Sequence, residues 1–219
     1  MGRYRLVFRH DRAGRLIEAQ EFEHLVFDRR RFTADILDEL TSSAPSTVTV
    51  HPDGVHIKHL YIERRVEPLD LFLREADEEA SDAVVRDFGQ TIRDLATANI
   101  FPGDLLLKNF GVTRHGRVTF YDYDELCLVT ECVFRHMPVA RDLEEEMSAE
   151  PWFYVGEKDV FPEEFLQFMG LDPRQRRVFL EEHGEVLTAD YWLGLQALHK
   201  EGQVLDVFPY PPSQRLRPS

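Results

Sequence analysis

The clearest periodic pattern lies between residues 81 and 100, where apolar residues recur at the spacing of an α-helix. Val84, Phe88 and Leu95 fall on one face of that helix. Ser81 is expected to cap its N-terminus, because a serine hydroxyl accepts a hydrogen bond from a backbone N–H of the first turn. We therefore predict a long amphipathic helix that ends just before the segment beginning at Asn99.

Shorter helical patterns surround this one. Residues 1–50 are expected to be helical in pieces, and Thr33 is the predicted N-cap of a helix with Ile36, Leu37 and Leu40 on its apolar face. A short helix is predicted to start near Pro68. Further helices are predicted within FPEEFLQFMG, DPRQRRVFLEEHG and TADYWLGLQALHKEG, before a proline-rich tail that is expected to be frayed.

Two segments show strand patterns instead. STVTVHPDGVHIKHLYI predicts two strands joined by the turn His51–Gly54, and its second strand is expected to run into the core because it becomes apolar on both faces. NFGVT and RVTFY, separated by Arg114–Gly116, predict a β-hairpin. Helices and small antiparallel sheets together indicate an α+β fold.

Composition narrows the function classes. The chain has 219 residues, 43% of them hydrophobic, and a net charge of -14, so it is expected to bury a core and to lack the basic surface of a nucleic-acid-binding protein. The sequence shows no apolar run of membrane-spanning length and no secretory leader, so a cytoplasmic location is expected. Cys127 and Cys132 are interpreted as free thiols in a reducing compartment.

Candidate chemistry follows the long helix. Asp104 and Asn109 lie five positions apart in a loop, and Asp122 follows the predicted hairpin. In protein-kinase-type phosphoryl transfer, an Asp positions the substrate hydroxyl, an Asn five residues later binds Mg²⁺, and so does an Asp after the next strand. Lys108 would place a cation near the transferred phosphoryl group.

The pattern alone leaves a second interpretation open. Asp104 can instead cap a turn, and Asp122 to Glu125 can instead form a solvated acidic loop. A strand that ends in Asp-x-Asp also resembles the nucleophile motif of aspartyl-phosphate phosphatases. The antiparallel hairpin and Glu125 disfavour that class, because its motif opens a parallel α/β fold.

The string NIFPGDLLLKNFGVTRHGRVTFYDYDE resembles the signature of the isocitrate dehydrogenase kinase/phosphatase family. HDRAGR, IKHLYIERRVEPLDLFL, AEPWF and DVFPEEF resemble other segments of that family, so the resemblance covers nearly the whole chain. It implies a bifunctional enzyme that phosphorylates a serine of isocitrate dehydrogenase with Mg-ATP and also removes the phosphate. This activity controls flux between the citric acid cycle and the glyoxylate bypass.

The resemblance also implies roles for individual residues. Asp104 matches the catalytic aspartate, Asn109 and Asp122 match the Mg²⁺ ligands, and Asp124 matches an acidic residue tied to the phosphatase reaction. The backbone of the hinge strand would receive the adenine of ATP or ADP. The matching hinge residues are His59, Leu60, Tyr61, Ile62 and Glu63.

The chain departs from the family pattern at two places. Glu18 stands where the family has an aspartate proposed as catalytic, and it can equally be a surface helix carboxylate. No glycine-rich phosphate loop is found, and Lys58 is interpreted as an ordinary strand lysine. We therefore expect residues 1–66 to be a remnant of a kinase N-lobe with the hinge strand, and residues 67–219 to be a mainly helical, kinase-like C-lobe.

These departures leave an alternative function open. The chain would then be a truncated, catalytically incompetent fragment that binds isocitrate dehydrogenase or a missing N-terminal part. An apolar face exposed where the N-lobe should pack would support that alternative.

Overall fold

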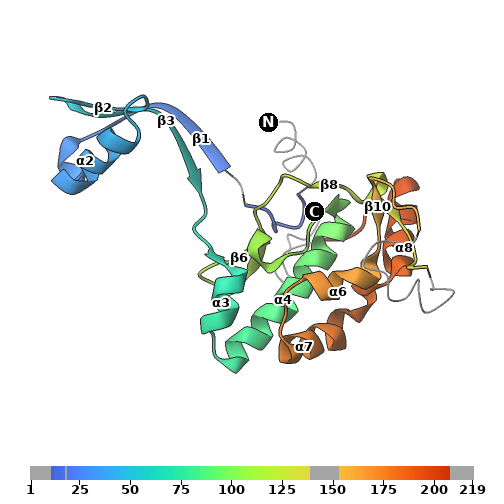
Figure 1. Ribbon diagram of the computed structural model, residues 1–219. Helices are drawn as coiled ribbons and strands as arrows, with labels where there is room; N and C mark the ends of the chain where they lie inside the picture. The colour runs from blue at the N-terminus through green and yellow to red at the C-terminus, as the bar shows by residue number, and fades with distance from the viewer. Residues whose placement is uncertain (1–10, 18, 139–152, 208–219) are drawn as a thin grey trace, which may run out of the picture. The chain divides into compact units, whose positions relative to one another are not determined.

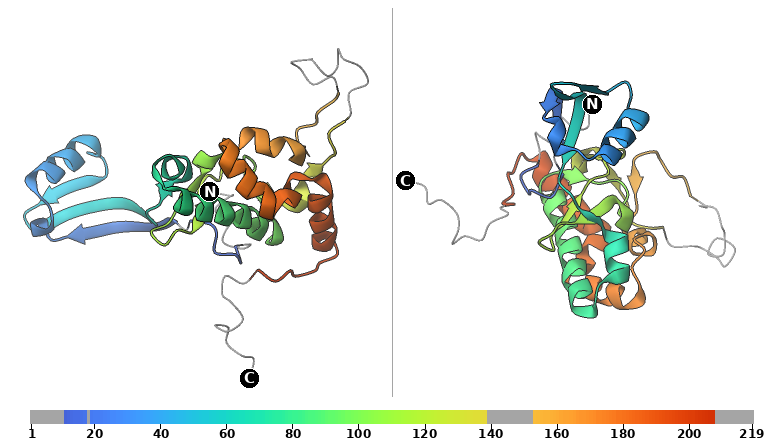
Figure 2. Two further views of the ribbon diagram at one scale, coloured as in Figure 1. Left: turned by 90° about the horizontal axis from the view of Figure 1, so that it is seen from below. Right: turned by 90° about the vertical axis from the view of Figure 1, so that its left-hand side faces the viewer.

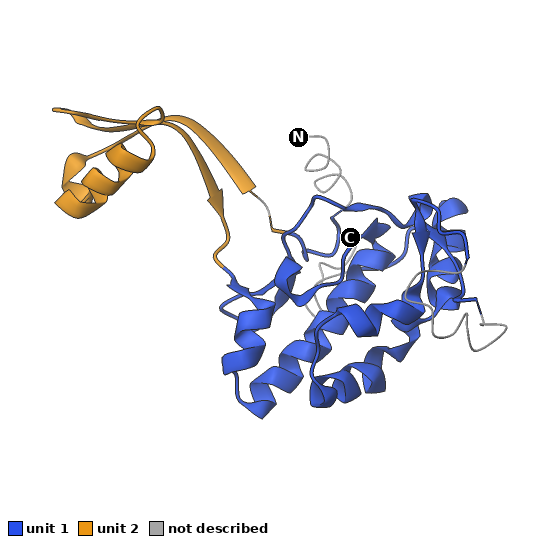
Figure 3. Cartoon of the chain, in the orientation of Figure 1, with its two compact units in different colours: residues 1–16, 66–219 blue, residues 17–65 orange. Residues whose placement is uncertain are grey.

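The computed structural model describes residues 11–17, 19–138 and 153–207 (Figure 1). They form two compact units, coloured separately in Figure 3. One unit is Ile17–Arg65, and the other contains the described residues up to Leu16 and from Val66 onward. Both units combine helices with antiparallel strands, which confirms the predicted α+β class.

The unit Ile17–Arg65 is a three-stranded antiparallel sheet in the order β1-β3-β2, with one α-helix. Its elements are β1 (Ala19–Phe27), a 3₁₀ turn (Arg29–Arg31), α2 (Ala34–Ser43), β2 (Val48–His51) and β3 (Gly54–Glu63). The predicted hairpin and helix are both confirmed. Thr33 is the N-cap of α2, since its side-chain oxygen accepts a hydrogen bond from the Ile36 backbone N–H at 3.4 Å.

A small core lies between α2 and the sheet of this unit. Leu37 of α2 packs with Val48 of β2 and with Val55 and Ile57 of β3, and all four side chains are buried. Alternation along β3 thus directs Val55 and Ile57 to the helix-covered face.

The sequence-based prediction was wrong for two parts of this unit. Ala19–Phe27 is a strand and not a helix, because it pairs along its length with β3. The far end of β3 does not enter a core: Tyr61 is 53% exposed and Ile62 49% exposed. The partner strand β1 offers mainly polar side chains there, so apolar residues at the end of β3 stay in solvent.

The larger unit is mainly helical. Its helices are α3 (Leu69–Glu75), α4 (Glu78–Thr97), α6 (Phe165–Phe168), α7 (Pro173–His183) and α8 (Ala189–Lys200), and its 3₁₀ turns are Leu107–Asn109, Val129–Glu131, Pro162–Glu164 and Gly184–Leu187. The predicted helices are confirmed, but α4 begins earlier than expected. Asp77, and not Ser81, caps α4 by accepting a hydrogen bond from the Ala80 N–H at 2.8 Å.

Three small sheets complete this unit. They are β4 (Glu67–Pro68) with β6 (Phe110–Val112) and β7 (Val118–Phe120), β5 (Ile100–Phe101) with β8 (Cys127–Leu128), and β9 (Val133–Phe134) with β10 (Asp159–Val160). The β6–β7 pair is the hairpin predicted from the sequence. The β9–β10 pair is parallel, whereas the other pairs are antiparallel.

The core of the larger unit is built around α4. Helices α7 and α8 both lie against it (Figure 2). Phe88 of α4 is fully buried and packs edge-on against Phe110 of β6, with ring centroids 4.9 Å apart. Trp192 of α8 is equally buried and stacks on Phe134, so aromatic side chains join the helices to the small strands.

No helix in the described part of the chain is long and apolar enough to cross a membrane.

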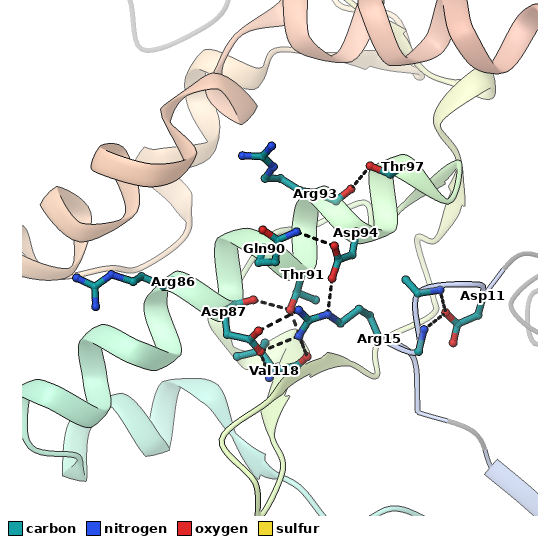
Figure 4. Close-up of polar contacts among 12 residues, drawn as sticks. Asp11, Arg15, Arg86, Asp87, Gln90, Thr91, Arg93, Asp94, Thr97 and Val118 are labelled. Atoms are coloured by element: carbon teal, nitrogen blue, oxygen red, sulfur yellow. Dashed lines mark hydrogen bonds and ion pairs between the residues drawn. The ribbon is translucent and has the colours of Figure 1, made fainter. Parts of the chain in front are cut away.

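A buried ion-pair network ties the N-terminal segment to α4 and the hairpin (Figure 4). The Arg15 guanidinium is 3% exposed and contacts Asp87 and Asp94, each at 2.7 Å. It also donates to the Val118 carbonyl of β7 at 3.1 Å, while the Val118 N–H donates to Asp87 at 2.6 Å. Burial by itself lowers the pKa of Arg15, but the hydrogen bonds and charges of Asp87 and Asp94 outweigh burial and raise that pKa.

Replacing Arg15 by Ala is expected to lower the free energy of unfolding of this unit by about 3 kcal/mol, because two carboxylates would lose their buried partner. Urea denaturation followed by tryptophan fluorescence measures the change, since Trp192 lies in the same core. Arg74→Ala is the matched control. Arg74 forms an exposed pair with Asp70 within α3, so its loss is expected to cost less than about 1 kcal/mol. Equal losses for the two variants would contradict the structural role of Arg15.

Candidate active site

The loop that carries Asp104 is fixed at both of its ends. Strand β5 pairs with β8, so that Phe101 lies opposite Cys127. Gly103 then turns the chain with φ +84°, a conformation that favours glycine, and lies directly against Glu125. This turn leaves the side chain of Asp104 exposed to solvent.

The hairpin brings Asp122 back to the same loop. Residues 107–109 form a single 3₁₀ turn, and β6 and β7 then run out and back with Phe110 opposite Phe120. The Tyr121 N–H donates to the Asn109 carbonyl at 3.1 Å, and the Tyr121 hydroxyl donates to the Lys108 carbonyl. The hairpin therefore closes onto the loop just before Asp122.

Five of the predicted site residues meet in one place. They line a cavity of about 170 Å³ together with Pro102 and Glu125, and they are Asp104, Lys108, Asn109, Asp122 and Asp124. The sequence alone predicted that some of them lie in one loop and the others directly after the hairpin. The structure brings them to a common space.

The side chains of this cavity differ in exposure. Asp104, Lys108 and Asp124 are exposed, Asp122 is half-buried, and Asn109 is only 5% exposed. The Asn109 side-chain amide donates to the Asp104 carbonyl at 3.5 Å, which orients Asn109 within the loop. The Asp124 N–H donates to the Asp122 carboxylate at 3.4 Å. The Asn109 amide and the Asp122 carboxylate thus each contact a backbone atom of a neighbouring site residue.

The cavity combines several negative charges with one cation, that of Lys108. Tyr121 directly precedes Asp122, and its pKa is raised by burial and by the charges of Asp70 and Asp122. Tyr121 therefore stays protonated at neutral pH and keeps its hydrogen bond to Lys108. An acidic cavity of this kind favours a divalent cation or a cationic group over a bare anion.

The donor atoms of the cavity fit Mg²⁺. Asp122, Asp124 and Asn109 supply hard oxygen ligands, the type that Mg²⁺ requires. Within the described residues no group of three or more His, Cys, Asp or Glu side chains is arranged so that it could hold a metal ion by itself. Mg²⁺ in phosphoryl-transfer sites is usually held by one or two carboxylates plus substrate phosphates, so an incomplete protein shell agrees with such a site.

The remaining predicted site residues lie elsewhere. The predicted hinge residues lie at the far end of β3, in the unit Ile17–Arg65. They are His59, Leu60, Tyr61, Ile62 and Glu63, and they pair in order with Glu23 to Ala19 of β1. Lys58 is an exposed residue of β3, as expected for a strand lysine. Glu18 lies outside the described residues.

A second, larger cavity adjoins the first. Its volume is about 810 Å³, and Asp104 and Glu125 line both cavities. Its other walls come from β8, β10 and the segment around α6, and include Cys127, Phe161 and Met169. Asp104 therefore stands at the border between a small acidic cavity and a wide, partly apolar one.

Sequence reasoning missed Glu125 as a lining residue of both cavities. The sequence did place Glu125 directly after Asp124, within the same acidic run as Asp122. That Glu125 faces the Asp104 loop is shown only by its close approach to Gly103. The Arg15 network was missed altogether, because its partners lie 72 and 79 positions away in the sequence.

Comparison with known proteins decides the family. Residues 1–212 match the sequence profile of the isocitrate dehydrogenase kinase/phosphatase (AceK) kinase domain. The chain belongs to this family. The resemblance predicted from the sequence motifs is therefore confirmed.

Curated members of the isocitrate dehydrogenase kinase/phosphatase family are closely similar over the whole chain. The protein of that name from Anaeromyxobacter sp. (strain Fw109-5) is 57% identical over 216 residues, which cover 99% of this chain and 38% of that protein. The protein of the same name from Anaeromyxobacter dehalogenans (strain 2CP-C) is 54% identical over 228 residues, which cover 99% of this chain and 39% of its own length. The chain thus spans less than two fifths of these relatives.

Gly103→Ala is expected to destabilise the larger unit more than Gly116→Ala does. Both glycines have positive φ, so both variants carry a backbone cost of about 1–2 kcal/mol. A Cβ at Gly103 would also lie 2.5 Å from the Glu125 Cβ, whereas a Cβ at Gly116 meets nothing within 4 Å. The extra crowding is expected to add about 1–3 kcal/mol, measured as the difference between the two urea transitions. Superimposable transitions would show that the loop is not packed against Glu125.

Proposed function

We propose that this chain supplies the catalytic loop and metal-binding hairpin of a bifunctional, Mg-ATP-dependent protein serine kinase and phosphoprotein phosphatase that acts on isocitrate dehydrogenase. One observation carries the proposal: Asp104, Lys108, Asn109, Asp122 and Asp124 line a single cavity in the order and setting that kinase chemistry requires. Membership of the isocitrate dehydrogenase kinase/phosphatase family supports the choice of protein substrate. The activity would control flux between the citric acid cycle and the glyoxylate bypass, in the cytoplasm.

In this proposal residues 67–219, which make up most of the larger unit, correspond to a kinase-like C-lobe, and residues 1–66 to a remnant of the N-lobe with the hinge strand. The residues up to Leu16 belong to the larger unit, so the unit boundary and the proposed lobe boundary differ there. The helix α4, the loop after β5 and the β6–β7 hairpin follow one another in the order expected of a C-lobe. The backbone of His59–Glu63 would receive the adenine of ATP or ADP, and Glu18 would be a further catalytic carboxylate. Both of these assignments rest on the resemblance alone.

Each residue of the cavity has a defined role in the proposed reaction. Asp104 orients the serine hydroxyl of the protein substrate and accepts its proton, which its exposure at the border of the wide cavity permits. Lys108 offsets negative charge on the transferred phosphoryl group. Asn109 and Asp122 are the residues that would hold Mg²⁺, which when bound neutralises charge on the nucleotide phosphates.

Phosphate removal would use the same cavity. Asp124 lies beside Asp122, to which its N–H is hydrogen-bonded, and its carboxylate is exposed. An exposed carboxylate next to a metal ligand can orient a water molecule for attack on a phosphoserine. We assign Asp124 to the phosphatase reaction for this reason.

Asp104→Ala is expected to reduce phosphate transfer from γ-labelled Mg-ATP to purified isocitrate dehydrogenase by about 10²–10⁴-fold, because the general base is lost. Asp124→Ala is the comparison variant: it is expected to reduce labelling less than Asp104→Ala does, because Asn109 and Asp122 remain to hold Mg²⁺, and to lose release of phosphate from phosphorylated isocitrate dehydrogenase. Normal labelling by Asp104→Ala would refute the assignment of that residue. A chain that is folded but does not label, even before mutation, would favour the alternative of a binding fragment, to be tested next with the N-terminal part of a relative added in trans.

Asp122→Ala is expected to abolish the Mg²⁺-dependent part of ATP binding, because the cavity would lose its half-buried carboxylate. Isothermal titration with ATP in the presence of Mg²⁺ and then of a chelator measures this part. Glu181→Ala removes the same charge from an exposed position of α7 and is expected to bind Mg-ATP as the unmodified chain does. Unchanged Mg-ATP affinity of Asp122→Ala would exclude Asp122 as a metal ligand.

A further inference from the structure

The two cysteines of the chain lie next to each other on the wall of the wide cavity. Cys127 is in β8 and Cys132 follows the 3₁₀ turn Val129–Glu131, and their Sγ atoms are 3.5 Å apart. No disulfide joins them in this structure. A disulfide bond has a sulfur–sulfur distance of about 2.0 Å, so about 1.5 Å of approach separates the present arrangement from a covalent bond.

The backbone holds the two cysteines in place from different sides. Cys127 is paired with Phe101 across the β5–β8 ladder. The side chain of Gln196, on α8, donates to the carbonyl oxygens of Val129 at 2.8 Å and Cys132 at 2.9 Å. Because each cysteine has its own backbone contacts, the proposed bond requires the two sulfur atoms to approach chiefly by side-chain rotation.

The two thiols differ in reactivity. Cys132 is 8% exposed, and its pKa is raised by its hydrogen bond to Cys127, by burial and by the charge of Glu131, against which the charge of Lys158 acts. Cys132 therefore remains a thiol, and its Sγ donates to the Leu128 carbonyl at 3.6 Å. A cysteine attacks an oxidant only as its thiolate, so Cys132, which keeps its proton, is the less suited of the two to react first.

Cys127 is also the more accessible of the two thiols. It is half-buried and lines the cavity of about 810 Å³, so a small oxidant can reach it from that side. Cys132 lines the same cavity, with its Sγ 3.5 Å from that of Cys127. An accessible cysteine with a second cysteine beside it is an arrangement found in redox-sensing proteins.

We propose that Cys127 and Cys132 form a reversible intramolecular disulfide when the protein meets a peroxide. The Cys127 thiolate attacks the peroxide O–O bond and forms a sulfenic acid, and the departing hydroxide takes up a proton to become water. Cys132 then loses its proton and attacks the Cys127 sulfur, and the sulfenic hydroxyl leaves as a second water. Two thiols and one hydrogen peroxide thus give one disulfide and two waters, with sulfur oxidised and peroxide oxygen reduced.

The bond would act on the loop that carries Asp104. Cys127 is paired with Phe101, three positions before Asp104, and Gly103 packs on Glu125, two positions before Cys127. A disulfide joins β8 covalently to the segment that Gln196 anchors, so it restricts the wall of the cavity at which Asp104 lies. An effect on phosphate transfer rests on the proposed function, whereas disulfide formation and its effect on the loop do not.

Treating the whole chain with hydrogen peroxide and then alkylating it, with intact-mass detection, tests the chemistry. We expect two alkylatable thiols before treatment, none after it, and both again after reduction with dithiothreitol. In Cys127→Ser and in Cys132→Ser the remaining thiol is expected to give no intramolecular bond, and in Cys132→Ser a dimedone-reactive sulfenic acid is expected at Cys127. Sulfinic acid formation in the unmodified chain without a disulfide, or a bond between two chains on a non-reducing gel, would overturn the proposal.

Amide hydrogen exchange of the oxidised and reduced chain tests the effect on the loop without any need for activity. We expect residues 100–106 and 127–132 to exchange more slowly in the oxidised chain, while α2, which lies in the other compact unit, exchanges at the same rate in both. Cys132→Ser treated with peroxide is the control and is expected to show no slowing. Unchanged exchange of residues 100–106 in a chain that has formed the disulfide would overturn the coupling to Asp104.

Discussion

The buried contact between Arg15 and the two carboxylates of α4 is the interaction on which the candidate site depends. The Arg15 guanidinium forms ion pairs with Asp87 and Asp94, and it also donates a hydrogen bond to the Val118 carbonyl of the hairpin. Helix α4 leads into the loop of Asp104, and the hairpin leads into Asp122. One cation therefore fixes the two elements whose ends must meet if a base and a metal ligand are to share a cavity.

Around that contact, short local interactions set the details of the site. Gly103 allows the sharp turn before Asp104, and the Tyr121 hydroxyl bonds to the Lys108 carbonyl after the hairpin returns. These contacts involve backbone atoms, so they position the loop while leaving the side chains of Asp104, Lys108 and Asp124 exposed. The proposed reaction with a protein substrate requires reactive groups at the surface, and the exposure of these three side chains meets that requirement.

The sequence predicted the parts of the structure that local patterns determine. Thr33 before an apolar face gave the position of α2, the glycine turns gave both hairpins, and the spacing of Asp104, Asn109 and Asp122 gave a cavity that the structure assembles. Strand β1 was missed because its state is set by pairing with β3, which a window along the chain cannot detect. The exposure of Tyr61 and the pairing of Arg15 were missed for the same reason, since both depend on which distant residues come to lie alongside.

The position of residues 17–65 within the chain has a consequence for biosynthesis. This unit is contiguous in sequence, whereas the larger unit contains residues from both sides of it. During translation, at about 5–20 residues per second, the small sheet and α2 can form while α4 is still inside the ribosome. Arg15 is synthesised before this unit, and Val118, whose carbonyl it contacts, follows 103 positions later. Arg15 therefore lacks its contact with Val118 for several seconds after its own synthesis, during which the smaller unit can already fold. The order of synthesis makes the larger unit the later of the two to complete its fold.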